Sequence, residues 1–199
     1  MRNKRAVFLD RDGTLNHDCG YTHRLEDFRL LDNVVEGLSI LHRLGFTLIV
    51  ATNQSGIARG YFKEEQLHRF NANLAETLRA RGVPLAGFYF SPYLPNAPLE
   101  AYRRESSCRK PAPGMILQAG REHAVDLSRS YVVGDKRSDV AAGRAAGCRT
   151  ILLRTGCAGT DDCPDSEPDW IADDLLQAAQ FIEAAESRLE KPILNRDAR

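Results

Sequence analysis

The sequence has no long hydrophobic run and no excess of charge of either sign. Its 199 residues include 27 Lys or Arg and 27 Asp or Glu, so the formal net charge is zero. No segment reaches the roughly 18 consecutive apolar residues that a membrane-spanning helix requires. A balanced charge also argues against broad binding to nucleic acids or anionic membranes. We therefore expect neither partner, and the composition is compatible with a local basic pocket for a phosphorylated small molecule.

The sequence also lacks a regular cysteine pattern, and the first apolar segment does not resemble a secretion signal. Residues 6–9 are too few for the core of a signal peptide, and no small-residue cleavage site follows them. The five cysteines are odd in number and irregularly spaced, which favours reduced thiols. We expect a cytoplasmic protein with one domain at residues 1–190 and a C-terminal tail at residues 191–199.

Short apolar segments alternate with longer amphipathic ones along the chain. We expect strands at residues 6–9, 46–51, 86–90, 131–133, 150–153 and 170–172, and helices at residues 34–44, 64–81, 113–124, 138–146 and 175–189. This alternation predicts an α/β fold, a Rossmann-like three-layer sandwich whose mostly parallel sheet has helices on both faces. Two long loops, residues 16–33 and 91–112, interrupt it, and neither is long enough for a large cap domain.

Two aspartates directly follow the first predicted strand. Asp10 and Asp12 belong to the segment DRDGTL, and ligands of open α/β sheets bind beyond the carboxyl ends of the strands. Two carboxylates at that edge suit nucleophilic attack combined with proton transfer. The alternative is a pair of turn-forming aspartates before a glycine.

Three further polar segments fall at the same edge. Residues 52–55 follow the second strand, residues 109–110 precede the helix that Pro113 opens, and residues 135–136 follow the fourth strand. Hydroxyl groups and a lysine at a helix N-terminus can bind phosphate oxygens, and carboxylates can bind Mg²⁺. Taken singly, the segments are also consistent with a polar loop, a solvated basic pair and a helix N-cap at Asp135. Together they favour a phosphate-handling active site.

Four motifs resemble those of the haloacid dehalogenase superfamily of phosphatases: Asp10-x-Asp12-Gly13-Thr14, Thr52-Asn53, Lys110 and Gly134-Asp135. Residues 10–14, 52–54 and 108–111 are similar to the branch that holds histidinol phosphatases and D-glycero-D-manno-heptose 1,7-bisphosphate phosphatases. Within this branch, residues 20–21, 52–60 and 153–156 favour the heptose members. The resemblance extends from residue 6 to about residue 155.

The resemblance implies a role for each matching residue. Asp10 would form an aspartyl-phosphate, Asp12 would protonate the leaving oxygen and then activate water, and Thr52 and Lys110 would hold the phosphoryl oxygens. Mg²⁺ would be bound by Asp10, the backbone carbonyl of Asp12 and Asp135. The implied substrate-binding residues are Asp18, Cys19, Gly20, Tyr21, Asn53, Gln54, Ser55, Arg109 and Lys136. Among them, Arg109 would bind a second, non-reacting phosphate through its planar guanidinium.

One departure from this branch concerns zinc. Its members usually carry Cys-x-His and then Cys-x-Cys before Arg-Lys-Pro, whereas the matching positions here are Ser91, Tyr93, Ser106 and Cys108. A single thiol cannot complete a four-coordinate zinc site. We therefore expect no zinc, and we expect the loop to be held by its own large side chains, Tyr93, Leu94, Leu99 and Tyr102.

The resemblance implies a Mg²⁺-dependent phosphomonoesterase that removes the 7-phosphate of a heptose 1,7-bisphosphate during the synthesis of nucleotide-activated heptose. A histidinol phosphatase or another small sugar-phosphate phosphatase is the nearest alternative. A non-catalytic phosphate-binding module is a second alternative, but the presence of Asp10 and Asp12 argues against it because a binding protein needs no nucleophile. A phosphotransferase would need a cap to exclude water. We expect a monomer whose partner is a small phosphorylated sugar.

Overall fold

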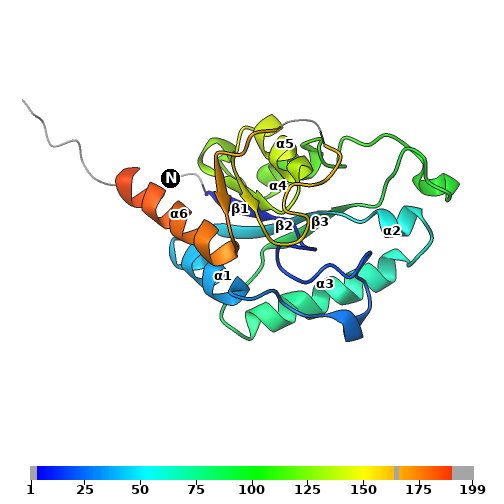
Figure 1. The fold of residues 1–199 in the computed structure, drawn as a ribbon, viewed down its shortest axis with the longest axis horizontal. Coiled ribbons are helices and arrows are strands. Elements are labelled where there is room, and N and C mark those ends of the chain that lie inside the picture. The colour runs from blue at the N-terminus through cyan, green and yellow to red at the C-terminus, as the bar shows by residue number, and fades with distance from the viewer. Residues whose placement is uncertain (1–3, 164–165, 190–199) are drawn as a thin grey trace, which may run out of the picture.

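The computed structural model describes residues 4–163 and 166–189 (Figure 1). Six strands form one sheet in the order β3-β2-β1-β4-β5-β6, and all neighbouring strands are parallel. The strands are β1 (Ala6–Leu9), β2 (Thr47–Asn53), β3 (Gly87–Ser91), β4 (Tyr131–Gly134), β5 (Arg149–Leu153) and β6 (Trp170–Ala172). The tail expected at residues 191–199 lies outside the described residues.

Helices cover both faces of this sheet, as Figure 1 shows. One face carries α1 (Val34–Arg43), α3 (Glu64–Arg79) and α6 (Leu175–Leu189), and the other carries α4 (Gly114–Glu122) and α5 (Arg137–Ala145). Shorter elements are α2 (Ser55–Ala58) and three 3₁₀ turns, η1 (Leu25–Asp27), η2 (Glu100–Tyr102) and η3 (Leu127–Arg129). The expected three-layer α/β sandwich is confirmed, and no large cap domain interrupts the described residues.

The side chains of β1 divide between the two hydrophobic layers. Val7 and Leu9 pack in the cluster that includes Leu38 of α1. Phe8 points to the opposite face and packs in the cluster that includes Ile116 of α4. Because successive side chains of a strand alternate between faces, a short apolar run buried on both sides is typical of a central parallel strand.

The elements differ from the expected ones mainly at the ends of β2. The strand extends to Asn53 because Thr52 and Asn53 pair with Phe90 and Ser91 of β3. The four-residue helix α2 was not expected, since one turn is too short to show helical periodicity. Among the described residues, no helix has the length and apolar character needed to cross a membrane.

The register of the central strands determines where the polar segments meet. Leu9 pairs with Val50 on one side and with Val133 on the other. The backbone N–H of Asp10 then donates to the carbonyl of Val133 at 3.0 Å. The residues that follow β1, β2 and β4 therefore leave the sheet at one edge, side by side.

We expect Phe8→Ala to lower the free energy of unfolding by about 3–5 kcal/mol, because it removes a fully buried ring from the center of one layer. Chemical denaturation measures this change. Leu25→Ala is the control, since Leu25 is 51% exposed and its truncation should cost well under 1 kcal/mol. A similar small loss for Phe8→Ala would contradict the packing described here.

Candidate active site

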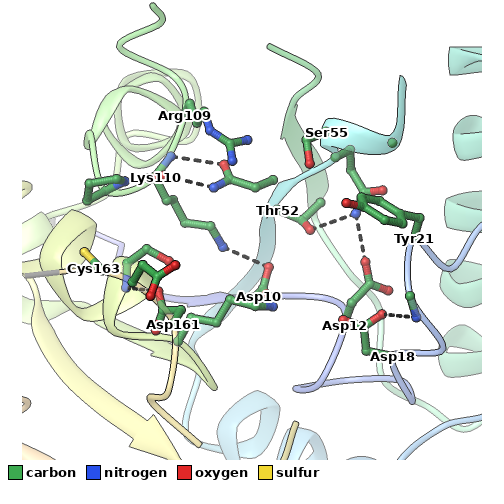
Figure 2. A pocket seen from close by; sticks show the side chains of 18 residues that line it. Asp10, Asp12, Asp18, Tyr21, Thr52, Ser55, Arg109, Lys110, Asp161 and Cys163 are labelled. Atoms are coloured by element: carbon green, nitrogen blue, oxygen red, sulfur yellow. Dashed lines mark hydrogen bonds and ion pairs between the residues drawn. The ribbon is translucent and has the colours of Figure 1, made fainter. Parts of the chain in front are cut away.

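A cavity of about 470 Å³ opens at the carboxyl edge of the sheet (Figure 2). Most of the residues expected at the site line it: Asp10, Asp12, Asp18, Gly20, Tyr21, Thr52, Asn53, Gln54, Ser55, Arg109, Lys110 and Lys136. Asp135 is fully buried and lies beside Asp10, behind the cavity wall. Asp135 and Cys19 are the expected residues that are not among those lining the cavity.

Two lysines surround the carboxylate of Asp10. The Nζ atom of Lys110 lies 2.8 Å from Oδ1 of Asp10 and also donates to the carbonyl of Ala51 at 2.7 Å. The Nζ atom of Lys136 lies 3.8 Å from Oδ2 of Asp10. Burial alone raises the pKa of Asp10, but the charges of Lys110 and Lys136 outweigh burial and hold this pKa below its usual range. Asp10 is thus an ionised, buried nucleophile candidate.

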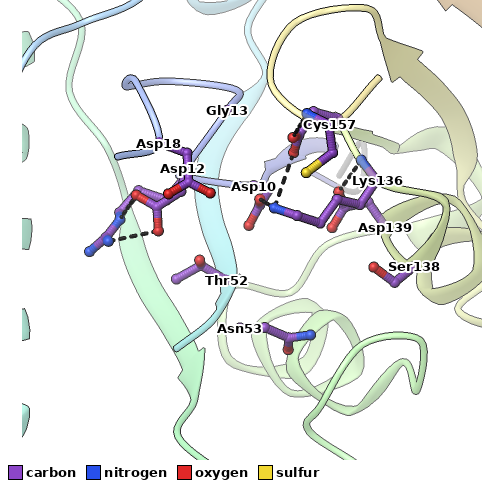
Figure 3. A network of polar contacts seen from close by, with 12 residues as sticks. Asp10, Asp12, Gly13, Asp18, Thr52, Asn53, Lys136, Ser138, Asp139 and Cys157 are labelled. Carbon is purple, nitrogen blue, oxygen red and sulfur yellow. Dashed lines mark hydrogen bonds and ion pairs between the residues drawn. The ribbon is translucent and has the colours of Figure 1, made fainter. Parts of the chain in front are cut away.

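Asp10 belongs to a cluster of three carboxylates, two of which, Asp10 and Asp139, are labelled in Figure 3. Oxygens of Asp10, Asp135 and Asp139 lie within 4.8 Å of one another. Asp139 also lies 2.5 Å from the Nζ atom of Lys110, whereas Oδ1 of Asp135 is buried and accepts no hydrogen bond. Burial and the negative charge of Asp10 raise the pKa of Asp135 to about 7. Three carboxylates outnumber the two lysines nearby, so the cluster fits a small cation with oxygen ligands.

Two glycines allow the chain to pass close to Asp135. A Cβ atom on Gly13 would lie 2.4 Å from Oδ2 of Asp135, and one on Gly156 would lie 2.2 Å from the same atom. Both glycines have positive φ angles, 84° and 53°. The backbone N–H of Cys157 donates to that oxygen at 2.7 Å. The segments after β1 and β5 therefore hold one orientation of the Asp135 carboxylate.

Asp12 is held by a different set of groups. Arg11 donates from Nε and Nη2 to the two carboxylate oxygens at 3.0 and 2.7 Å, and Asn16 adds a bond of 2.9 Å. The amide nitrogen of Gln54 donates to Asp12 at 2.9 Å and to Oγ1 of Thr52 at 3.0 Å. The two carboxylate oxygens of Asp12 thus accept four hydrogen bonds in this state.

Asn53 fixes the backbone of Lys110. Its Nδ2 atom donates to the carbonyl of Lys110 at 2.9 Å, and its Oδ1 atom accepts from the N–H of Lys110 at 3.0 Å. This pair of bonds connects the end of β2 to a residue 57 positions later in the chain. Asn53 therefore contributes to the placement of the Lys110 ammonium group, in addition to lining the cavity.

The segment after Asn16 forms the other wall. The carboxylate of Asp18 accepts from the N–H of Gly20 at 2.9 Å, and Tyr21 turns toward the cavity with a φ of 57°. Cys19 instead faces solvent, while its N–H donates to Oγ1 of Thr22 at 2.9 Å. Cys19 is exposed and is not among the residues that line the cavity, and its expected contact with the substrate stays a prediction.

Arg109 and Ser55 line the upper rim in Figure 2. The Nη1 atom of Arg109 donates to the carbonyl of Tyr93 at 3.2 Å. The guanidinium of Arg104 stacks on the ring of Tyr93 at 3.8 Å from its centroid, and the centroids of the Tyr93 and Tyr102 rings lie 6.3 Å apart. Aromatic and cationic side chains thus surround the segment that carries Arg109.

Comparison with known proteins places this geometry in a family. A family model described as HAD-hydrolase-like matches residues 107–178. The D-glycero-beta-D-manno-heptose-1,7-bisphosphate 7-phosphatase of Yersinia pestis is 42% identical over 90% of this chain and 95% of its own length. The protein of the same name from Photorhabdus laumondii is 47% identical over 76% of this chain and 81% of its own. The chain belongs to the haloacid dehalogenase (HAD) family.

A solved HAD structure has the same architecture. The D,D-heptose 1,7-bisphosphate phosphatase from B. bronchiseptica, complexed with magnesium and phosphate, matches with a TM-score of 0.78 and 27% identity. The match covers 91% of this chain and 99% of that one. The resemblance found in the sequence is confirmed, and this HAD protein is a phosphatase.

Several residues of this HAD site were not expected from the sequence. Asp139 joins the carboxylate cluster from the first turn of α5, where its Oδ2 accepts from the N–H of Lys136 at 3.0 Å. Lys136, and not Asp135, is the N-cap of α5. Asp161 lines the cavity and accepts from the N–H groups of Arg137 and Ser138 at 2.6 and 3.1 Å. The spacing of Asp135 and Asp139 was the available signal for Asp139, whereas no local pattern marks Asp161.

We expect Gly13→Ala to lower phosphatase activity by about 100-fold or more, because the added methyl group displaces the Asp135 carboxylate. Initial rates of phosphate release measure the loss. Gly147→Ala is the matched control: its φ of 81° gives the same backbone strain, and its Cβ would meet nothing within 4 Å. Equal activity losses in both variants would show that strain, and not contact with Asp135, is responsible.

Proposed function

We propose that this enzyme is a Mg²⁺-dependent phosphomonoesterase that removes the 7-phosphate of D-glycero-D-manno-heptose 1,7-bisphosphate through an aspartyl-phosphate. The observation that carries the proposal is the ionised, buried carboxylate of Asp10, which lies 2.8 Å from Lys110 at the floor of a cavity with Arg109 on its rim. The names of the relatives from Yersinia pestis and Photorhabdus laumondii support this substrate. The reaction would serve the synthesis of nucleotide-activated heptose.

The chemistry divides between Asp10 and Asp12. A lone pair of Asp10 forms the new O–P bond while the bond from phosphorus to the sugar oxygen breaks. Asp12 gives that oxygen a proton, and Thr52 and Lys110 hold the phosphoryl oxygens as negative charge redistributes. In the second step Asp12 takes a proton from water, the water oxygen bonds to phosphorus, and Asp10 and inorganic phosphate are released.

The surroundings of Asp12 support both of its proposed roles. Four N–H donors orient the Asp12 carboxylate, which takes a proton from water in the second step. To act as an acid, Asp12 must first hold a proton, and one donor must then be replaced by an acceptor. The Gln54 side chain meets this need, because rotation of its amide exchanges nitrogen for oxygen.

A bound Mg²⁺ would neutralise charge on the transferring phosphoryl group. The residues proposed to hold it are Asp10, Asp135 and the backbone carbonyl of Asp12. The Oδ1 atom of Asp135, which is buried, accepts no hydrogen bond and lies 3.6 Å from the Nζ atom of Lys136, supports this assignment. The raised pKa of Asp135, which a nearby cation would lower, supports it as well. The relative from B. bronchiseptica was solved with magnesium.

The remaining parts of the proposal concern binding and context. Asp18, Gly20, Tyr21 and Ser55 would contact the sugar, and Lys136 would lie near the reacting phosphate. Residues 1–190 would work as one domain, as a cytoplasmic monomer with no zinc. Histidinol phosphate is the alternative substrate, but its amine would face the cationic Arg109, which disfavours it.

Asp10→Asn should reduce turnover by at least about 1,000-fold, because it removes the nucleophile but retains the side chain's shape. Phosphate release and a thermal unfolding curve test this prediction together. A folded Asp10→Asn protein with substantial activity would refute the aspartyl-phosphate mechanism.

The substrate is tested by phosphate release with Mg²⁺ from a panel of phosphate esters. The panel contains both anomers of heptose 1,7-bisphosphate, histidinol phosphate and common sugar phosphates. We expect the highest kcat/KM for a heptose 1,7-bisphosphate. A preference for histidinol phosphate, or equal activity on all of them, would retain the mechanism and refute the heptose assignment.

A further inference from the structure

Arg11 is a buried cation to which the proposed reaction assigns no role. It lies between Asp10 and Asp12 in the sequence, and among the described residues it is the largest side chain that is fully buried. Taking a guanidinium group out of water is costly unless the group is paired and hydrogen-bonded. The partners of Arg11 therefore indicate what its burial serves.

The guanidinium group of Arg11 contacts both oxygens of the Asp12 carboxylate. Nε donates to Oδ1 at 3.0 Å, and Nη2 donates to Oδ2 at 2.7 Å. Two parallel bonds from a planar group fix the orientation of a carboxylate as well as its position, which a single donor does not. The Asp12 side chain is 12% exposed and lines the cavity, whereas Arg11 lies behind it (Figure 2).

Two adjacent residues of α3 hold the guanidinium group in turn. The Cζ atom of Arg11 lies 4.5 Å from the center of the Phe70 ring, and Nη1 donates to Oδ1 of Asn71 at 3.1 Å. Asn71 is the polar member of an otherwise apolar buried face of α3, and its Nδ2 atom has no hydrogen-bond partner. An unpaired buried donor costs free energy. The bond from Arg11 offsets part of this cost, so Asn71 is a dedicated support for the guanidinium group.

Arg11 also contacts the wall of the cavity. Its Nη2 atom donates to the carbonyl of Thr22 at 2.6 Å, and Thr22 directly follows Tyr21, which lines the cavity. A purely structural role of Arg11 would act through this bond. The two roles affect different steps, because a displaced wall weakens the binding of every substrate alike, whereas a misoriented Asp12 slows only the steps that transfer a proton.

We infer that Arg11, supported by Asn71, is a positioning residue that orients Asp12 for proton transfer to the leaving oxygen. This inference rests on the proposed function and deepens it. In the first step the electron pair of the breaking O–P bond stays with the sugar oxygen, and the proton of Asp12 neutralises that oxygen. A carboxyl group that is free to rotate is less often aligned with the leaving oxygen, so the proton arrives more slowly.

The test compares heptose 1,7-bisphosphate with its analogue that has sulfur in place of the oxygen between C7 and phosphorus. An alkoxide needs a proton to leave, whereas a thiolate leaves without one, and kcat/KM covers only the steps up to this departure. Asp12→Asn defines the expected pattern. Its kcat/KM should fall by about 100- to 10,000-fold for the oxygen ester, as for the loss of a general acid, and far less for the sulfur ester.

We expect Arg11→Lys and Asn71→Leu to show the same pattern at a smaller size, with kcat/KM reduced about 10- to 100-fold for the oxygen ester and less than about threefold for the sulfur ester. Arg11→Lys retains the charge but not the planar pair of donors. Asn71→Leu removes the support of Arg11 without changing Asp12, and it carries the comparison alone if Arg11→Lys does not fold. Asn73→Leu is the matched control, because it makes the same exchange at a partly exposed position of α3.

The kinetic constants of Asn73→Leu should equal those of the wild type, and thermal unfolding verifies that each variant is folded. Equal losses for both esters in the folded Arg11 and Asn71 variants would overturn the inference and make Arg11 a support for the wall at Thr22. Unchanged activity in these variants would overturn it as well. Equal losses for both esters in Asp12→Asn would instead refute the proton transfer in the proposed function.

Discussion

The arrangement of the site depends on one buried ammonium group placed between two carboxylates. The Nζ atom of Lys110 lies 2.8 Å from Asp10 and 2.5 Å from Asp139, and all three side chains are almost fully buried. In an interior of low polarity an isolated lysine or aspartate would lose its charge. The charges of Asp10 and Asp139 outweigh burial and raise the pKa of Lys110, and the charge of Lys110 helps to lower the pKa of Asp10, whereas burial and the charge of Asp10 raise the pKa of Asp139. The contact also ties the segment before α4 to the end of β1. Removing either partner would leave an uncompensated buried charge, which is far more costly than losing an exposed ion pair.

The fold and most of the candidate site could be predicted from the sequence, because the strands are recognisable and the site residues lie at their ends. Apolar runs alternating with amphipathic segments indicate parallel strands, and parallel strands bring their carboxyl ends to one edge. Asp10, Thr52 and Asp135 therefore meet although they are far apart in the chain. Lys110 was expected from its place before a helix, and its approach to Asp10 follows once α4 covers that face.

The residues that sequence reasoning missed are positioned by contacts between loops. Asp139 reaches the cluster because α5 begins at Arg137, so its orientation depends on a helix boundary that patterns locate only within a few residues. Asp161 arrives through the segment after β5, whose path is determined by bonds such as that of the Gly159 N–H to the carbonyl of Asp135. The turn around Cys19 is a related case, since Asp18 and Tyr21 line the cavity whereas Cys19 between them is exposed, and the sequence alone does not indicate this difference.

The strand order has a consequence for how the protein is made. β1 is central, and its neighbour β4 is completed only at Gly134, after about two thirds of the chain has left the ribosome. Until then Asp10 has neither Asp135 nor Asp139 beside it, and β1 has one side open. A growing chain that stalls before β4 exposes an apolar strand edge and has no carboxylate cluster. Synthesis of the fourth strand and of the first turn of α5 thus covers the open side of β1 and supplies Asp135 and Asp139 to the carboxylate cluster, so chains that end earlier are unable to catalyse the reaction.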